Sequence, residues 1–309
     1  MIINNIEIKP GENKTIDFNV SKLASGTIIK IHAHIYRSKV EGPTILVTGG
    51  VHGDEINGVE IIRRVVSSHL FDNLNCGTVI ALPLVNVYGF INFSRELPDG
   101  KDINRSFPGS KNGSLASRVA NIITQQILPY SDMGIDFHTG GGSIYNYPQT
   151  RAYRNDKKSL ELADIFNAPL TIESGLISKS LRKEASKRNI PMLVYEGGES
   201  LRLDEFSIKE GIGGIKKVLF HYGMINDNIN NQETITLKQH TWIRASVAGI
   251  FIAKKITGDW FKKGDILGAI TNPYGQFEKK IIAKQDGFIF GHENMPVTHL
   301  GRALFHIGS

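Results

Sequence analysis

Between Thr44 and Val66 the chain reads TILVTGGVHGDEINGVEIIRRVV. An apolar run ends there at two glycines, and a helical spacing of apolar residues begins a few positions later. The pattern predicts a buried strand, a sharp turn and a helix. His52 and Glu55 fall in the turn. Because ligands of open α/β sheets bind beyond the carboxyl ends of the strands, this pair is placed to bind a metal ion such as zinc. A chance spacing, with acidic residues that only stabilise the start of a helix, is the simpler alternative.

Two further predicted strands end on a polar residue followed by glycines. Ser131–Phe137 leads to His138, and Ile190–Tyr195 leads to Glu196. Two histidines and one carboxylate form a catalytic zinc set that leaves a position for water, whereas a structural site usually needs four ligands, cysteine among them. We therefore predict one Zn²⁺ per chain, bound by His52, Glu55 and His138. Glu196 is the candidate general base and acid, although a solvated loop carboxylate would look the same in sequence.

A long polar loop, Val85–Gly113, follows the second predicted buried strand, Gly77–Leu84. Loops of this length inside a compact domain are usually functional. Arg105 offers a planar fork suited to a substrate carboxylate, with Asn104 beside it as a hydrogen-bond partner. Arg95 could donate to the oxyanion that develops as water attacks. Each arginine could instead form an ordinary surface salt bridge.

His32 and His34 share the polar face of another predicted strand, Thr27–Tyr36, in which polar and apolar residues alternate. The two side chains could form a metal pair. Histidines spaced in this way on a strand more often belong to an exposed face, which is the alternative that we keep open.

Strands alternate with helices up to residue 224, which predicts the α/β class, with a mostly parallel, mixed sheet flanked by helices. From Asn226 a polar linker leads into short strand-like runs cut by turns, between Trp242 and Ile307. This pattern of short strands and turns predicts a small all-β domain. We therefore expect a catalytic α/β domain of residues 1–225, and a linker with a β-barrel or β-sandwich domain in residues 226–309.

The composition excludes several classes of protein. With 36 Lys and Arg against 30 Asp and Glu among 309 residues, the net charge is +6, which suits an anionic substrate. No basic block with interleaved aromatics indicates nucleic-acid binding. The start of the chain lacks a signal-peptide pattern, and no apolar run is long enough to span a bilayer. Cys76 is the single cysteine, so no intramolecular disulfide can form. We predict a soluble, cytoplasmic protein, in which strand edges of the β domain would allow a homo-oligomer.

Four motifs resemble, in this order, the succinylglutamate desuccinylase/aspartoacylase family of zinc-dependent deacylases, which is related to the zinc carboxypeptidases. They are GGVHGDEINGVE, RELPDGKDINRSFPG, DFHTGGG and YEGGE, and they span Gly49–Glu199. The segment from Trp242 onward looks like the β domain that many family members append. It is similar to biotinyl/lipoyl folds, but it has no Met-Lys-Met-like tip, which argues against a carrier role.

The resemblance implies a zinc-carboxypeptidase-like fold and a role for each motif. Zinc would be held by His52, Glu55 and His138, and Glu196 would activate the zinc-bound water. Asn104 and Arg105 would hold the substrate carboxylate, and Arg95 would polarise the scissile carbonyl. The loop around Pro98–Lys101 looks more like the bacterial and archaeal branch than the aspartoacylase branch, so N-acetylaspartate is not the expected substrate.

The residues and the resemblance together predict a zinc-dependent amidohydrolase. It would remove an acyl group, through zinc-activated water, from an N-acylated amino acid or related small amine that bears a carboxylate. A metallocarboxypeptidase acting on short peptides and a non-catalytic metal-binding or assembly protein are the alternatives. A cleft narrowed by the β domain would favour the deacylase, and binding alone would not need Glu196. The residues that could read the substrate are Tyr145, Tyr147, Arg151, Arg154 and Arg182.

Overall fold

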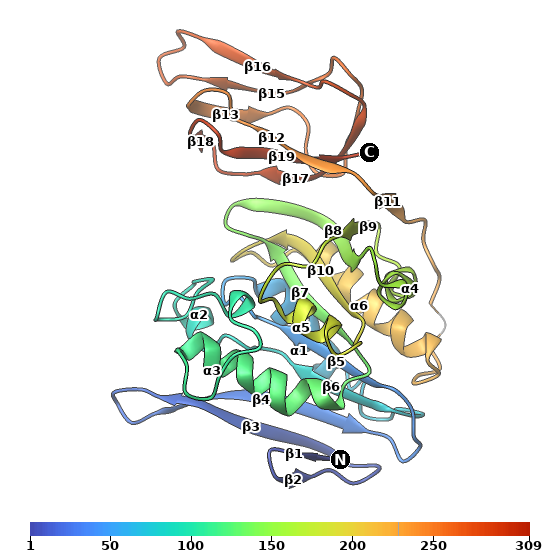
Figure 1. Cartoon of the computed structure of the whole chain (residues 1–309). Helices are drawn as coiled ribbons and strands as arrows, with labels where there is room; N and C mark the ends of the chain where they lie inside the picture. Colours follow the sequence, from blue (N-terminus) through green and yellow to red (C-terminus); the bar gives the residue numbers. More distant parts are fainter. Residues whose placement is uncertain (228) are drawn as a thin grey trace.

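The computed structural model describes residues 1–227 and 229–309. Within these residues, one mixed sheet of 13 strands runs through the molecule (Figure 1). In spatial order its first part comprises β3 (Asn13–Lys22), β4 (Ile28–Arg37), β6 (Thr78–Leu82), β5 (Thr44–Gly49), β7 (Met133–Gly140), β10 (Met192–Glu199), β8 (Ile144–Tyr153) and β9 (Leu170–Ser174). The strands from β6 to β10 are parallel, whereas the pairs β3–β4, β4–β6 and β10–β8 are antiparallel. The expected α/β fold with a mixed sheet is therefore confirmed.

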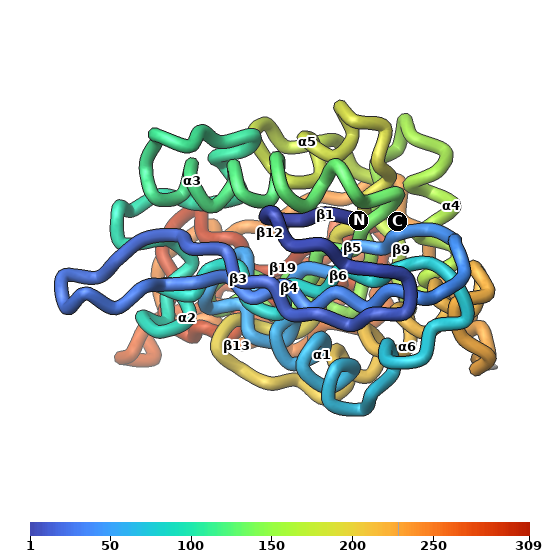
Figure 2. The backbone as a smooth tube through the Cα atoms, turned by 90° about the horizontal axis from the view of Figure 1, so that it is seen from below, coloured from blue at the N-terminus to red at the C-terminus, as the bar shows by residue number. Residues whose placement is uncertain are grey.

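Helices cover both faces of this sheet (Figure 2). One face packs against α3 (Leu115–Ile122), its π-helical continuation η2 (Ile123–Ile127) and α5 (Leu181–Ser186). The other face packs against α1 (Ile56–Ser67), α4 (Lys157–Phe166) and α6 (Glu205–His221). Shorter elements are the strands β1 (Ile2–Ile3) and β2 (Ile6–Glu7), the helix α2 (Val87–Ile91) and the 3-10 turns η1 (Ile103–Arg105) and η3 (Leu128–Tyr130). Among the described residues, no helix is both long and apolar enough to cross a membrane.

The burial of the central strands follows from their sequences. Every residue of β5 is buried, as its apolar run predicts, and β4 alternates between buried and more exposed side chains. After β5 the chain turns at Gly50, whose φ of 58° lies in the left-handed region that favours glycine. Helix α1 then packs closely on β7. The missing side chain of Gly58 permits this packing, because a Cβ there would lie only 2.7 Å from the Cβ of Phe137. This close packing brings the turn after β5 next to the end of β7.

The C-terminal region forms a β-sandwich. One layer comprises β12 (His240–Arg244), β19 (Ala303–Gly308) and β17 (Gly287–Glu293), with β14 (Trp260–Phe261) paired to β17. The other layer comprises β16 (Glu278–Ile282), β15 (Ile266–Thr271), β13 (Gly249–Ala253) and β18 (Val297–Thr298). Buried side chains from both layers form one cluster, which includes Phe251, Leu267, Ile289 and Phe305.

This sandwich is joined to the α/β part through strand β8. One edge of β8 pairs with β10, and the other edge pairs first with β17, through Ile144, Tyr145 and Asn146, and then with β9. The predicted linker also contributes a strand, β11 (Ile235–Leu237), which pairs with β9; residue 228 of that linker lies outside the described residues. The all-β region is present as expected, and it extends the main sheet. Its boundary at residue 225 stays a prediction.

Strands β8 and β9 were not predicted from the sequence. Strands β7 and β10 continue beyond their predicted ends at Phe137 and Tyr195, to Gly140 and Glu199. His138 lies within β7 and Glu196 lies within β10, although both were expected just after a strand. The reason is additional pairing: Gly140 pairs with Glu199, and β10 beyond Tyr195 pairs with β8. Glu196 is consequently fixed by a strand on each side, and His138 by its pairing with β10, so neither residue belongs to a loop.

Candidate metal centre

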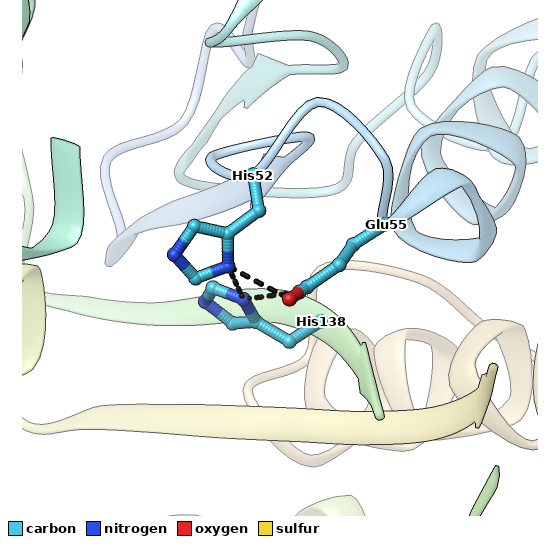
Figure 3. A group of neighbouring side chains, drawn as sticks. All are labelled: His52, Glu55 and His138. Carbon is cyan, nitrogen blue, oxygen red and sulfur yellow. Dashed lines mark hydrogen bonds and ion pairs between the residues drawn. The ribbon is translucent and has the colours of Figure 1, made fainter. Parts of the chain in front are cut away.

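His52, Glu55 and His138 converge near the carboxyl ends of β5 and β7 (Figure 3). His52 lies in the turn after β5, Glu55 is the N-cap residue of α1, and His138 belongs to β7. The three side chains are buried, and their ligand atoms lie within 4.8 Å of one another. Among the described residues, they are the one group of His, Cys, Asp and Glu side chains that is arranged to hold a metal ion.

The Nδ1 atoms of the two imidazoles face the centre of this group. Oε1 of Glu55 lies 2.8 Å from Nδ1 of His52, and Oε2 lies 2.7 Å from Nδ1 of His138. The two Nδ1 atoms are 3.2 Å apart (Figure 3). The backbone N–H of Thr139 also donates to Oε2 of Glu55, at 3.2 Å, which holds the carboxylate in this orientation.

The opposite ring nitrogens contact two further carboxylates. Nε2 of His52 lies 3.1 Å from Oδ1 of Asp102, and Nε2 of His138 lies 2.8 Å from Oδ2 of Asp136. Because a carboxylate accepts hydrogen bonds, these contacts favour a proton on each Nε2 and leave Nδ1 as the nitrogen that faces Glu55. The Glu55 carboxylate between the two Nδ1 atoms favours positive charge there, from protons on Nδ1 or from a metal ion that replaces them. The donor set therefore fits a metal ion.

The same surroundings shift the pKa values of the group. Burial opposes the charged form of His138, but Asp136 and Glu55 outweigh it and raise its pKa well above the usual value. Burial likewise opposes a charged His52, and Glu55 and Asp102 raise its pKa. For Glu55, burial is outweighed by the two histidines, which lower its pKa well below the usual value. The carboxylates therefore favour positive charge on the two histidines, and the histidines favour the ionised form of Glu55.

Glu196 lies next to this group, because β10 and β7 pair it in register with His138. Its side chain is partly exposed. Nδ2 of Asn146 donates to Oε2 of Glu196 at 2.7 Å, and Nη2 of Arg151 lies 2.9 Å from the same oxygen. In the described part of the chain, Oε1 makes no hydrogen bond. One carboxylate oxygen is thus held, and the other is available.

One cleft of about 540 Å³ is lined by the predicted metal ligands, the predicted catalytic residues and the predicted carboxylate-binding residues. Its lining includes His52, Glu55, Arg95, Asn104, Arg105, His138 and Glu196. The wall also includes Arg151, Arg154 and Arg182, and it is completed by His240 and Trp242 from β12 of the C-terminal sandwich. Segments far apart in sequence therefore form a single binding space. Tyr145 and Tyr147 are not part of its lining.

Arg95 is engaged by carboxylates of the metal group. Its Nη1 lies 3.1 Å from Oε1 of Glu55, and its Nη2 lies 2.9 Å from Oδ2 of Asp102. The side chain is about a third exposed, with relative exposure of 37%, so it borders the cleft while it pairs with these acids. Its suggested role at an oxyanion stays a prediction.

Asn104 and Arg105 lie in the 3-10 turn η1 and also line the cleft. Oδ1 of Asn104 accepts from the backbone N–H of Leu181 at 2.8 Å, which ties the turn to the start of α5. Arg105 is exposed and donates through Nη1 to the carbonyl of Asn104 at 2.7 Å. The loop that carries them is thus ordered by contacts to a helix of the core.

Arg182 is the most deeply buried arginine of the cleft, with 6% exposure. It donates to the carbonyl oxygens of Arg151 at 2.9 Å and Gly175 at 2.7 Å, and to Oγ of Ser174 at 3.1 Å. Burial, and then the charge of Arg151, lower its pKa to about 10, so it remains charged at neutral pH. A buried cation held by neutral groups is suited to an anionic ligand.

Three residues that contact the proposed ligands and base were not predicted from the sequence. Asp102 contacts His52, Asp136 contacts His138, and Asn146 contacts Glu196. Asp136 and His138 form an Asp-x-His pair on one strand, and residues two apart on a strand share a face. That spacing could have indicated a carboxylate beside the histidine. His32 and His34, in contrast, contact Asp17 at 2.6 Å and Thr15 at 3.0 Å on the outer strand pair. They are not in the metal group.

The arrangement can be compared with that of known proteins. Residues 41–222 match the model of the succinylglutamate desuccinylase/aspartoacylase catalytic domain. The chain belongs to the succinylglutamate desuccinylase/aspartoacylase family. The matched range contains all the metal-group residues together with Glu196, so the match includes these residues of the cleft.

Among relatives of this desuccinylase/aspartoacylase-family chain is the N-alpha-acetyl-L-2,4-diaminobutyric acid deacetylase of Halomonas elongata, with 32% identity over 199 residues. That match covers 61% of this chain and 57% of the relative, which is less than two thirds of the relative's length.

Solved structures resemble almost the whole family chain. A succinylglutamate desuccinylase/aspartoacylase from Rhodobacter sphaeroides has 26% identity and a TM-score of 0.84, over 96% of this chain and 95% of the other. The product-bound ectoine utilization protein EutE (DoeB) from Ruegeria pomeroyi has 22% identity and a TM-score of 0.86, over 97% of each chain. The latter likeness concerns the fold alone, and it includes the C-terminal sandwich.

Proposed function

We propose that this family member is a zinc-dependent amidohydrolase that removes an acyl group from an N-acylated amino acid or a related small amine. One observation carries the proposal: two imidazole Nδ1 atoms and a carboxylate converge, and Glu196 borders the same cleft from the adjacent strand. The family relationship and the deacetylase relative support hydrolysis of a linear amide.

The donor set favours zinc over other common metals. Two imidazole nitrogens and one carboxylate are a frequent catalytic zinc set, whereas calcium and magnesium prefer oxygen ligands throughout. His52, Glu55 and His138 would hold the ion, and Asp102 and Asp136 would orient the two imidazoles. When bound, zinc would lower the pKa of a water ligand and polarise the acyl carbonyl.

Glu196 is the group that moves protons in this proposal. Asn146 and Arg151 hold its Oε2, so Oε1 takes the proton of the attacking water and later gives it to the leaving amine. The carbonyl carbon loses the amine, and the acyl group leaves as a carboxylic acid. Arg95 would donate to the oxyanion from its place beside Glu55.

The remaining cleft residues would bind the substrate. Arg105 and the side-chain amide of Asn104 lie at one rim, where they would hold the carboxylate of the amino acid. Arg182 supplies a second buried positive charge. The cleft volume of about 540 Å³ is that of a small-molecule site, and His240 and Trp242 close one side of it. Both features favour an acylated monomer over a peptide.

The decisive experiment combines metal analysis with a substrate panel. Zinc-loaded protein would be given N-acetyl, N-succinyl and N-formyl amino acids, N-α-acetyl-L-2,4-diaminobutyrate and short peptides. Release of an amino acid from an acylated monomer, lost with a chelator and restored by zinc, is the expected result. Cleavage of peptides alone would replace the proposal with a carboxypeptidase, and stoichiometric zinc without any turnover would overturn the enzymatic function.

A further inference from the structure

We propose that Asn146 and Arg151 are positioning residues for Glu196. We also propose that Gly291 of the C-terminal sandwich, by lacking a side chain, leaves the space that the Asn146 amide needs to reach Glu196. The inference rests on the proposed function, because it concerns the group that we take as the base. It adds a role for strand β8, and it makes the C-terminal sandwich a support of the reaction centre.

The two positioning side chains approach Glu196 from opposite directions along the neighbouring strand. In the antiparallel pairing of β10 with β8, Arg151 lies opposite Val194 and Asn146 lies opposite Gly198. These partners stand two residues before and two residues after Glu196. Both polar groups nevertheless reach the same carboxylate oxygen, Oε2, at 2.9 Å and 2.7 Å. Two donors on one oxygen fix the carboxylate plane and direct Oε1 toward the substrate.

The two contacts to Glu196 are largely buried, so losing either of them should loosen the Glu196 side chain. Asn146 is 4% exposed, and Arg151 is half-buried, with 22% of its side chain exposed. The backbone carbonyl of Arg151 accepts from Nη1 of Arg182, which anchors that part of β8 to α5. A charged hydrogen-bond partner and a buried amide together restrict a side chain that would otherwise have several rotamers.

Gly291 connects this arrangement to the C-terminal sandwich. It lies directly opposite Asn146 in the pairing of β17 with β8. A Cβ at Gly291 would lie 2.9 Å from Oδ1 of Asn146 and 3.1 Å from the Cβ of His306. Because the Cβ of His306 belongs to a buried strand of the sandwich, the end of the Asn146 side chain is the part that would move. Gly291 therefore leaves the space in which the Asn146 amide can turn its Nδ2 toward Glu196.

The test compares kcat, KM and zinc content of purified full-length variants on the best substrate of the panel. Asn146→Ala, Arg151→Gln and Gly291→Ala should each lower kcat by about 10-fold to 100-fold, because small displacements of a reacting group cost rates of this order. KM and bound zinc should stay within about threefold of wild type, since among the described residues the side chains of Asn146 and Arg151 bond to Glu196 rather than to the metal group or to Asn104 and Arg105. Arg151→Lys, which keeps the charge, should regain part of the lost kcat.

A double variant tests the link between Gly291 and Asn146. If the glycine acts through the amide, Asn146→Ala/Gly291→Ala should be no slower than Asn146→Ala alone. Lys280→Ala, an exposed change in β16 of the same sandwich, serves as the matched control and should behave as wild type. Thermal unfolding of every variant identifies any that fails to fold, and Arg151→Lys remains informative in that case.

Three outcomes would contradict the inference. Unchanged kcat in all variants would show that Glu196 needs no support, and a raised KM with unchanged kcat would make these residues substrate contacts. Additive losses in the double variant would disconnect Gly291 from Asn146. Full activity of Glu196→Gln would instead remove Glu196 as the base, and a lack of turnover in the zinc-loaded wild type would overturn the proposed function, so the failures can be told apart.

Discussion

At the scale of single residues, each imidazole of the metal group is held between the metal position and a carboxylate. Asp136 holds His138 and accepts in addition from the hydroxyl of Thr48, at 2.6 Å. Asp102 holds His52 and pairs with Arg95. These outer carboxylates fix which nitrogen carries the proton, and hence which one can bind a metal.

Replacing Asp136 should weaken zinc binding without removing a ligand. In Asp136→Asn the acceptor for Nε2 of His138 loses its charge, so we expect zinc affinity to fall about 10-fold to 100-fold. Competition with a chromophoric chelator measures the affinity. Asp72→Asn is the control, because within the described residues the Asp72 carboxylate pairs with the exposed His69, away from the metal group. Equal affinities for Asp136→Asn and wild type would mean that Asp136 does not orient the ligand.

Removing the carboxylate of Glu196 should separate metal binding from chemistry. We expect Glu196→Gln and Glu196→Ala to lower kcat by about 10²-fold to 10⁴-fold, the usual contribution of a general base. Zinc content should remain that of wild type, since Glu196 is not in the metal group. Single-turnover hydrolysis and metal analysis on the same sample provide both measurements, and retained turnover would remove Glu196 from the mechanism.

At the scale of elements, α6 shows that its glycines serve different purposes. A Cβ at Gly214 would lie 2.1 Å from the ring of Phe166 on α4, and one at Gly211 would lie 2.4 Å from Ile61 on α1. A Cβ at Gly213 would meet nothing within 4 Å. Glycine inside a helix usually weakens it. Gly211 and Gly214 instead allow α6 to pack closely on its neighbours.

Neighbouring alanine substitutions in α6 should therefore have opposite effects. Gly213→Ala should raise the free energy of unfolding by about 0.5–1 kcal/mol, because alanine costs less backbone entropy in a helix. Gly214→Ala should lower it by about 1–3 kcal/mol through overpacking against Phe166. Urea denaturation followed by circular dichroism measures both. The same sign for the two variants would contradict the packing of α6.

Strand β8 was missed for a physical reason. Its sequence, IYNYPQTRAY, contains Pro148, and proline removes a ladder hydrogen bond from a strand interior. In the structure, Pro148 lies between the residues that pair with β17 and those that pair with β9, and within the irregular step of the β10 pairing. A residue without an N–H is tolerated there. The central strands were predictable because apolar runs mark them, whereas one partner of β8, the strand β17, lies more than a hundred residues further along the chain.

At the scale of the whole molecule, positive charge is concentrated in the cleft. Five arginines line it, while its carboxylates Glu55 and Glu196 are already engaged by other residues. The net charge of +6 suggested an anionic substrate but not where it binds. That His52, Glu55, His138 and Glu196 come together could be predicted because strand ends meet at one edge of the sheet. The contribution of His240 and Trp242 could not, since nothing in the sequence places β12 beside that edge.

This charge should appear in substrate preference. We expect N-acetylglutamate to have a KM about tenfold lower than N-α-acetyl-L-2,4-diaminobutyrate, a difference of about 1.4 kcal/mol. A second anion on the substrate would meet several cleft arginines, whereas an ammonium would meet carboxylates that already pair with arginines. Raising the salt concentration from about 0.05 M to about 0.5 M should reduce the difference by screening. Initial rates at several salt concentrations measure it, and a lower KM for the cationic substrate would contradict the expectation.

The position of β8 between β10 and β17 also bears on how the protein is made. On a ribosome, residues 144–153 emerge long before residues 287–293, and β17 is in turn covered by β19 at residues 303–308. Until those last strands have been synthesised, one edge of β8 is partly unpaired and the space around Asn146 is open. A nascent chain can therefore assemble its metal ligands early, but it completes the support of Glu196 only when almost all of this sequence has been translated.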